Sequence, residues 1–303
     1  MLFHEYFAEW MDVYKLGAVR PITYQKYEMT LQRVKEIAPN LKIREITKRS
    51  YQNLINEYAK THEKQTTMDF HHHLKAALLD AIDEGLLSSD PTRKVIIKGK
   101  TPAAKKPKFL SQFEFQSLLA HLNLEDELNW DWFILLIAKT GMRFSEALAL
   151  TPADFDFAGQ KIKVCKTWNY KCKSGGFAET KNQSSQRTLQ IDPLLSRQFT
   201  EHVKELAADA PIFVNGRVFN STVNSRLKSL CKKAGVPVIS IHSLRHSHAS
   251  LLIYAGVSIA SIAKRLGHSS ITTTQETYLH IIRELENQDN DKVIQYLVAL
   301  HSD

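Results

Sequence analysis

Amphipathic helix spacing runs through the first 85 residues. Apolar side chains return every three or four positions, which places them on one side of a helix. Thr47 has the side chain of a helix N-cap, and Gly85 follows the last periodic position. The apolar positions fall into four groups: Phe3, Tyr6, Phe7, Trp10 and Tyr14; Tyr24, Tyr27, Leu31 and Val34; Tyr51, Leu54, Ile55 and Tyr58; and residues 68–82. The pattern predicts a small bundle of four short helices.

From residue 107 onward, helical spacing alternates with shorter strand-like segments. Three segments of alternating pattern, with a turn at Gly175 and Gly176, predict a small antiparallel sheet. These strands are expected over residues 161–166, 177–180 and 187–191. Helices are expected over residues 111–122, 130–141, 196–207, 223–234, 242–255, 259–266, 272–281 and 293–300. The predicted fold class is therefore mainly α with a small antiparallel β-sheet.

Residues 92–108 form a basic linker between these two parts. The linker carries seven cations and no acid: Arg93, Lys94, Lys98, Lys100, Lys105, Lys106 and Lys108. A solvated linker explains such a run, and contact with a DNA backbone explains it equally well. The chain of 303 residues is long enough for two domains.

Net charge favours a polyanionic partner. The chain has a formal net charge of +8. The first 105 residues carry 17 Lys and Arg against 13 Asp and Glu, a net of +4, so the remaining residues also carry +4. Both parts are thus cationic, as expected of a protein that binds nucleic acid, although charge alone does not identify the partner.

Other features of the sequence predict a cytoplasmic protein with no membrane partner. The three cysteines are an odd number and show no paired spacing, which fits a reducing compartment. The first ten residues lack the basic start of a signal peptide. The longest apolar run, residues 133–138, is far shorter than the ~20 residues needed to span a bilayer.

The segment TGMRFSEAL places Arg143 beside the start of a helix. Gly141 ends the preceding helix, so Arg143 lies in the connection, where backbone N–H groups favour anions. A guanidinium at this point could hold two phosphate oxygens. A surface arginine paired with Glu146 is the alternative.

The segment HSLRHSHASLLIYAG combines histidines and an arginine at the start of an apolar helix. His242 and Arg245 share a face, and His246 follows His242 by one turn. Such a cluster suits phosphate binding. A metal site is the competing interpretation, formed by His242, His246 and His248 or by residues 71–73, although no cysteine or carboxylate completes a ligand set nearby.

Three further candidates come from two other segments. In ETKNQSSQRTLQI, Lys181 falls where the sheet turns and Arg187 follows. In KRLGHSSITTTQETYLHI, His268 follows a helix-ending glycine, and Tyr278 lies in the next helix. Taken singly, Lys181 is typical of a solvated turn and Tyr278 of a core or rim position.

These segments together resemble the signature segments of the tyrosine recombinase (phage integrase) family. TGMRFSEAL, TKNQSSQRTL, HSLRHSHASLLIYAG and LGHSSITTTQETYLHI stand in the family's order, and the last two are specific. The resemblance implies a helical core-DNA-binding domain over residues 1–105 and a mixed α/β tyrosine recombinase catalytic domain over residues 107–303. Larger members carry a further N-terminal arm-binding domain, so this chain is either a two-domain recombinase or part of a longer protein.

The resemblance also implies an activity and a role for each candidate residue. The expected activity is site-specific DNA cleavage and rejoining through a covalent 3′-phosphotyrosyl intermediate, as in the integration or excision of a mobile element. Tyr278 would be the nucleophile, and Arg143 and Arg245 would stabilise the transition state. His242 would act as an acid or base at the phosphate, His268 would contact a phosphate oxygen, and Lys181 would protonate the leaving 5′ oxygen. His246 and Glu146 would support these residues.

The same resemblance implies the partners. The expected DNA partner is a pair of double-stranded recombination sites. The protein is expected to form a homotetramer on the paired sites and to be a monomer without DNA. Accessory proteins that bend the DNA or set the direction of recombination are further expected partners. No metal or other cofactor is expected. Two other functions stay open at this point: DNA relaxation like that of type IB topoisomerases, and regulation by a DNA-binding protein that has lost cleavage.

Overall fold

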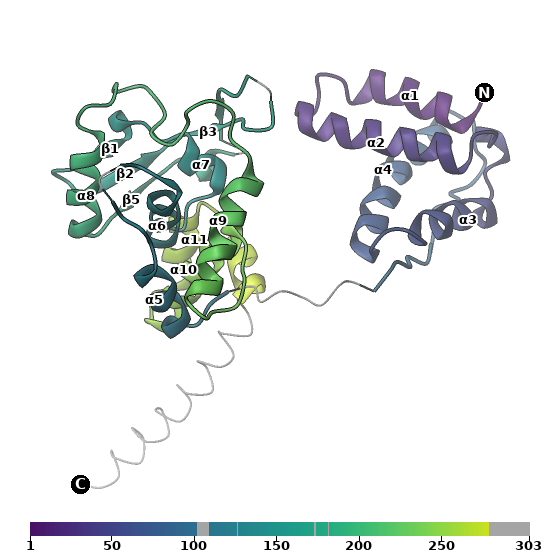
Figure 1. Cartoon of the computed structure of the whole chain (residues 1–303). Helices are drawn as coiled ribbons and strands as arrows, with labels where there is room; N and C mark the ends of the chain where they lie inside the picture. The colour runs from purple at the N-terminus through teal and green to yellow at the C-terminus, as the bar shows by residue number, and fades with distance from the viewer. Residues whose placement is uncertain (102–108, 126, 173, 181, 279–303) are drawn as a thin grey trace, which may run out of the picture. The chain divides into compact units, whose positions relative to one another are not determined.

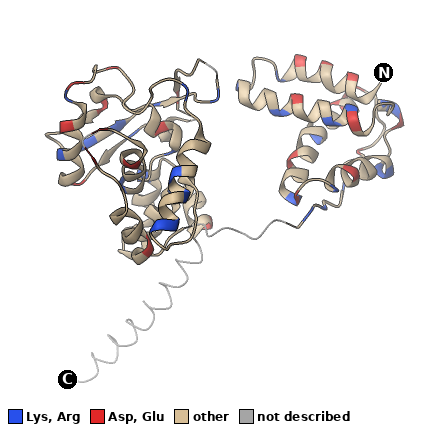
Figure 2. Ribbon diagram, viewed as in Figure 1, with Lys and Arg blue, Asp and Glu red and all other residues tan. Residues whose placement is uncertain are grey.

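The chain forms two compact units, Met1–Lys105 and Lys106–Asp303 (Figure 1). The structure is a computed structural model that describes residues 1–101, 109–125, 127–172, 174–180 and 182–278. Each unit has a hydrophobic core of its own. Lys and Arg positions occur in both units, interspersed with Asp and Glu (Figure 2). None of the helices described combines the length and the apolar character needed to cross a membrane.

Helices build the N-terminal unit, as the apolar spacing predicted. They are α1 (Phe3–Tyr14), α2 (Pro21–Ile37), α3 (Lys48–Ala59) and α4 (Lys64–Asp83), with a 3₁₀ turn η1 (Ile43–Glu45) before α3. The side chain of Thr47 accepts a hydrogen bond from the Ser50 N–H at 3.1 Å, which confirms Thr47 as the N-cap of α3. Helix α4 begins at Lys64 rather than at residue 68, because its polar first turn has no apolar period to reveal it.

The core of the second unit is built around two long helices. Helix α6 (Trp130–Thr140) is buried along almost its whole length, and α10 (Ile241–Tyr254) packs against it. Asn129 caps the start of α6, and Gly141, with φ 69°, ends it. The shorter helix α7 (Phe144–Leu148) follows at once and begins beside Arg143, as expected.

Further helices surround this pair (Figure 1). They are α5 (Gln112–Ala120), α8 (Pro193–Val203), α9 (Asn220–Lys233) and α11 (Ile259–Leu266). Helix α11 has the predicted bounds. Helices α8 and α9 each begin three residues before the predicted starts at 196 and 223. Asp192 caps α8 and Pro193 takes its first position, whereas α9 opens with a polar turn at Asn220. Residues 271–278 are helical. The rest of the helix expected over 272–281 and all of that expected over 293–300 lie outside the described residues.

The strands of this unit are antiparallel, as predicted, but they form two sheets rather than one. Strands β1 (Phe155–Asp156), β2 (Lys161–Val164) and β5 (Arg187–Gln190) make a three-stranded sheet in the order β1-β2-β5. Strands β3 (Lys166–Trp168) and β4 (Phe177–Glu179) form a separate pair. A 3₁₀ turn, η2 (Pro152–Asp154), precedes β1.

The division at Cys165 has a structural reason. The last pair between β2 and β5 joins Val164 to Arg187. The residues before Arg187 form the 3₁₀ turn η3 (Gln183–Ser185) and not a strand, so β5 offers no further partner. After Cys165 the chain therefore pairs with β4 instead.

Candidate active site

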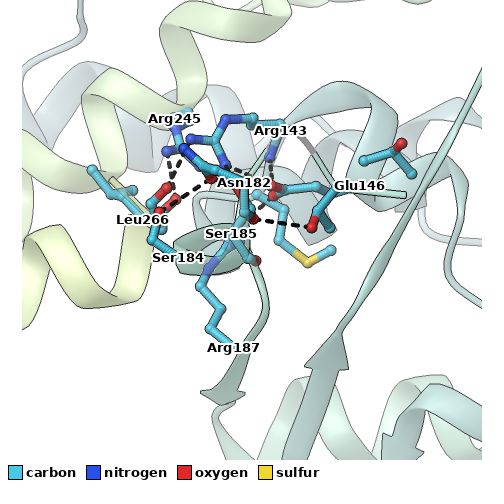
Figure 3. A network of polar contacts seen from close by, with 12 residues as sticks. Arg143, Glu146, Asn182, Ser184, Ser185, Arg187, Arg245 and Leu266 are labelled. Atoms are coloured by element: carbon cyan, nitrogen blue, oxygen red, sulfur yellow. Dashed lines mark hydrogen bonds and ion pairs between the residues drawn. The ribbon is translucent and has the colours of Figure 1, made fainter. Parts of the chain in front are cut away.

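Three arginines converge on the C-terminal end of α11. Arg187 Nε donates to the carbonyl of Arg265 at 2.6 Å, Arg245 Nη2 donates to Leu266 O at 2.6 Å, and Arg143 Nη2 donates to Gly267 O at 2.9 Å. The last carbonyls of a helix have no intrahelical partner and carry partial negative charge. Helix α11 thus orients guanidinium groups that come from α10, β5 and the start of α7 (Figure 3).

Two of the carbonyls that accept from these arginines belong to glycines at helix ends. Gly267 ends α11 at φ 68°, in the left-handed region where glycine is favoured. Gly141 ends α6 in the same way, and its carbonyl accepts a second hydrogen bond from Arg245, at 2.8 Å from Nη1. Arg245 is therefore held between the ends of two helices and is only 3% exposed.

Glu146 is a buried carboxylate shared by two of the arginines. Its Oε1 lies 2.6 Å from Arg143 Nη1, and its Oε2 lies 2.9 Å from Arg187 Nη2. Burial acts to raise the pKa of Glu146, but Arg187 and Arg143 outweigh this effect and lower it. The pairing of Arg143 with Glu146 exists, yet it is not the surface pair of the alternative interpretation, because Glu146 is 1% exposed.

The cluster has an excess of positive charge. Arg143, Arg187 and Arg245 contribute three positive charges, and Glu146 contributes one negative charge, which leaves two positive charges uncompensated among these groups. Burial, followed by the charge of Arg143, lowers the pKa of Arg245 to about 9, so its guanidinium stays charged at neutral pH. Burying charge without a partner is costly, and a bound anion would offset that cost.

Tyr278 is buried next to this cluster. The ring is 2% exposed and packs in an apolar group with Ala249, Ile253, Ile262 and Leu266. Its Oη lies 3.0 Å from Nδ1 of His246 on α10. Burial raises the pKa of Tyr278 to about 12, and the charge of Arg245 acts in the opposite direction. The hydroxyl is therefore protonated at neutral pH.

Three histidines complete the described part of the site. The rings of His242 and His246 lie 4.9 Å apart on successive turns of α10. The protein atoms crowded around His242, together with Arg245 and Arg143, lower its pKa. Burial, and then the same two arginines, lower the pKa of His268 to about 4, while His268 Nδ1 lies 2.7 Å from Thr274 Oγ1. His268 is therefore uncharged at neutral pH.

Of the predicted site residues, Arg143, His242, Arg245, His268 and Tyr278 lie around one region of the second unit. Lys181 lies outside the described residues. The residues that follow it do belong to the region: Asn182 Oδ1 accepts from Ser185 Oγ at 2.5 Å, and Ser185 Oγ lies 3.4 Å from Arg143 Nη1 (Figure 3).

Arg187 is a member of the cluster to which the sequence assigned no role. It is 4% exposed at its side chain and contacts Glu146 Oε2 and the carbonyls of Arg265 and Ser185. Its partners in α7 and α11 are 41 and 78 residues away along the chain. No local spacing could have indicated these contacts.

The histidines of the competing metal interpretation have other partners. His248 Nδ1 donates to Ala138 O at 2.9 Å, and its Nε2 accepts from Arg265 Nε at 2.9 Å, so both ring nitrogens are in use. His71 contacts Tyr51 and His73 contacts Thr30, each at 2.8 Å. Within the described ranges, no group of three or more His, Cys, Asp or Glu could hold a metal ion.

Comparison with known proteins identifies the family. Residues 108–284 match the model of the phage integrase family, and residues 2–59 match the N-terminal SAM-like domain of phage integrases. The first match alone spans more than half of the chain. The chain belongs to the tyrosine recombinase (phage integrase) family. The resemblance of its motifs to this family is thereby confirmed.

Individual relatives fit this membership. This integrase-family chain is 35% identical over 158 residues to a tyrosine recombinase XerC of Bifidobacterium longum strain DJO10A, covering 50% of this chain and 44% of that protein. The chain thus matches less than half the length of that relative. It is 24% identical to the integrase of Staphylococcus phage L54a, over 97% of this chain and 92% of the integrase.

A solved structure shares the fold. The Tn1549 transposon integrase, in complex with a circular intermediate DNA, superposes with a TM-score of 0.78 at 19% identity, covering 95% of this chain and 99% of that one. The predicted fold class, mainly α with a small antiparallel sheet, is that of the integrase structures.

Proposed function

We propose that this chain is a site-specific recombinase that cuts and rejoins double-stranded DNA through a phosphotyrosine link. The observation that carries the proposal is the buried cluster of Arg143, Arg187 and Arg245, with Glu146 as its paired carboxylate and the Tyr278 hydroxyl beside it. A cluster with two uncompensated positive charges suits a phosphodiester. The phage integrase match supplies the reaction class.

The reaction is a substitution at phosphorus. Oη of Tyr278 loses its proton and forms a bond to the phosphorus atom, and the bond from phosphorus to the 5′ oxygen breaks. The products are a 3′-phosphotyrosine and a free 5′ hydroxyl. A 5′ hydroxyl from a partner strand reverses the step, and because the phosphotyrosine keeps the energy of the diester, no nucleotide is consumed.

The two arginines of the predicted set have the clearest role. A phosphodiester carries one negative charge, and attack by a phenolate adds a second, so the total negative charge of the transition state equals the excess positive charge of the cluster. Arg143 and Arg245 each use two guanidinium nitrogens for anchoring contacts. Each guanidinium has five N–H donors, which leaves donors for the non-bridging oxygens.

We assign the remaining roles to two histidines and to Lys181. His242 lies close to Arg245 and Arg143, where its neutral ring can hydrogen-bond a phosphate oxygen. His268 lies just after α11, and its contact with Thr274 orients the ring. The ring would hydrogen-bond a second phosphate oxygen. Lys181, outside the described residues, would give a proton to the leaving 5′ oxygen.

The two units would divide the work on DNA. Residues 1–105 would bind the core site, and residues 107–303 would hold the scissile phosphate. The match of residues 2–59 to the N-terminal domain of phage integrases supports the first assignment, and the basic linker 92–108 fits contact with the DNA backbone. We propose four protomers on two synapsed sites and a monomer without DNA, with accessory proteins that bend the DNA or set direction.

A trapping assay tests this function. Fragments that the chain selects from random DNA supply the binding site, and a nick placed near the cleavage point lets the released 5′ fragment diffuse away. The chain should then accumulate as a covalent DNA adduct, and Tyr278→Phe should not. Binding without any adduct would favour a regulator, whereas relaxation of a supercoiled plasmid without exchange between two sites would favour a topoisomerase.

A further inference from the structure

The buried position of Tyr278 creates a problem for its use as a nucleophile. With a pKa of about 12, only ~10⁻⁴ of the hydroxyl is ionised at pH 8. Attack therefore requires a group that accepts the proton as the new bond forms, and such a group must lie within hydrogen-bond reach of the hydroxyl, roughly 2.6–3.2 Å.

The surroundings of Tyr278 narrow the choice of acceptor. The ring packs against the apolar side chains of Ala249, Ile253, Ile262 and Leu266, which cannot take a proton. Arg245 is near enough for its charge to act on Tyr278, but a guanidinium only donates hydrogen bonds. His246 Nδ1 lies at 3.0 Å from the hydroxyl oxygen and can accept.

We propose that His246 is a catalytic residue, the general base that takes the proton of Tyr278 when the hydroxyl attacks phosphorus. The proposal rests on the recombinase function proposed above and adds a residue to its site. As the bond from Tyr278 Oη to phosphorus forms, the O–H bond breaks and its proton moves to His246 Nδ1. When a 5′ hydroxyl later displaces the tyrosine, the proton of that hydroxyl passes to Lys181, the bond from phosphorus to Tyr278 Oη breaks, and His246 returns its proton to Oη.

This role differs from the supporting one that the sequence suggested for His246. Residues 242 and 246 share one face of α10, and the structure shows that the two rings meet different partners. His242 lies near the guanidinium groups of Arg143 and Arg245, whereas His246 contacts the reacting oxygen of Tyr278. The helical repeat thus places one ring for the phosphate and the next ring for the nucleophile.

The titratable groups around His246 affect the pH dependence of the cleavage rate. Among the described residues they include His242 on α10, Tyr278 in residues 271–278, and His268 after α11, and Arg245 acts on Tyr278 and on His268. His242 and His268 both remain in a His246 variant. A change in the pH profile of that variant therefore reports the loss of His246 itself.

His246→Asn is the informative substitution. The Asn side-chain oxygen can accept the hydrogen bond of Tyr278 where Nδ1 does, but it cannot take the proton. Cleavage of the nicked substrate in a single turnover should be slower by about 10²- to 10⁴-fold, the range typical of a lost general base. The rate should also lose the rise with pH that deprotonation of His246 produces, while DNA affinity stays the same.

Two chemical substitutions separate this defect from others. Replacing Tyr278 by 3-fluorotyrosine lowers the pKa of the phenol, so it should restore much of the rate of His246→Asn while changing the wild-type rate little. A 5′-bridging phosphorothiolate, which needs no acid to leave, should not rescue His246→Asn. His121→Asn, at the exposed histidine that follows α5, is the matched control and should cleave at the wild-type rate.

The outcomes distinguish this proposal from the function it rests on. If the wild-type chain forms no adduct with its selected site, the recombinase function fails. If the wild-type chain forms the adduct and His246→Asn cleaves as fast or faster with the same pH profile, His246 is not the base. Rescue of His246→Asn by the phosphorothiolate would likewise overturn the proposal, because it would place the defect at the leaving group.

Discussion

Glu146 and Arg187 form an ion pair in which both side chains are almost fully buried. Arg187 Nη2 lies 2.9 Å from Glu146 Oε2, and the side chains are 4% and 1% exposed. The other carboxylate oxygen of Glu146 contacts Arg143, which would face the phosphate. Glu146 therefore links the buried Arg187 to Arg143. We therefore expect both stability and chemistry to depend on the same pair.

Removing the acid should destabilise the second unit. Glu146→Ala leaves Arg187 buried without its anion, and loss of one partner of a buried pair costs about 3–5 kcal/mol. Urea unfolding of the variant and the wild-type chain measures the difference. Glu201→Ala, which breaks an exposed pair with Lys204, should cost less than about 1 kcal/mol. Equal losses for the two variants would contradict the buried role of Glu146.

Arg143→Lys should separate chemistry from binding. Lysine keeps the charge but cannot contact Glu146 and Gly267 O and still present a second donor to phosphate. We expect adduct formation to slow by about 10²- to 10³-fold with little change in DNA affinity. Arg197→Lys, at an exposed position of α8, is the control and should leave the rate unchanged. A rate near that of the wild type for Arg143→Lys would show that the guanidinium fork is not used.

Gly267 should tolerate no side chain. A Cβ at this position would lie 2.9 Å from Arg187 Nη1 and 3.1 Å from Ser184 O, and φ is +68°. Gly267→Ala should lower the free energy of unfolding by more than about 1–2 kcal/mol and should slow cleavage, since Arg143 and Arg187 lose their positions. Gly256→Ala isolates the backbone effect, because φ is +79° and an added Cβ would meet no neighbouring side chain or backbone atom within 4 Å. It should lose some stability and keep its cleavage rate.

Buried neutral histidine should make stability depend on pH. Burial, followed by the charge of Arg265, lowers the pKa of His248 to about 3, against about 6.5 in an unfolded chain. Between these values the unfolded chain binds a proton that the folded protein does not, so stability falls as the pH is lowered from about 6.5 toward 3. Unfolding measured at several pH values should show a slope of up to about 1.4 kcal/mol per pH unit from this residue. His248→Gln should have a shallower slope, and an unchanged slope would contradict this origin.

The sequence predicted the parts of this fold that depend on local spacing. The apolar period located the helices of the N-terminal unit, and the spacing of three between Arg143 and Glu146 suggested their pairing but not the burial of Glu146. The bounds of α11 were also predicted, because Gly267 marks its end. The start of α4 was placed too late, at residue 68 rather than Lys64, because the first turn of this helix has no apolar residue to mark it.

Contacts between distant segments could not be predicted in this way. Arg187 reads as one polar position of a short strand, and its contacts depend on how α7 and α11 pack against β5. His246 and Tyr278 are 32 residues apart, so their hydrogen bond depends on the packing of residues 271–278 against α10. The split of the sheet at Cys165 likewise follows from the turn η3, whose polar residues resemble those of an ordinary loop.

Peptide mapping of the trapped complex tests the central claim most directly. After the chain reacts with its nicked site, the complex is digested with nuclease and trypsin and analysed by mass spectrometry. The peptide of residues 266–283 should carry a nucleotide that is joined through its 3′ phosphate to Tyr278. Tyr278→Phe should yield only the unmodified peptide. A covalent link to any other residue, or strand cleavage by Tyr278→Phe at the wild-type rate, would contradict the account.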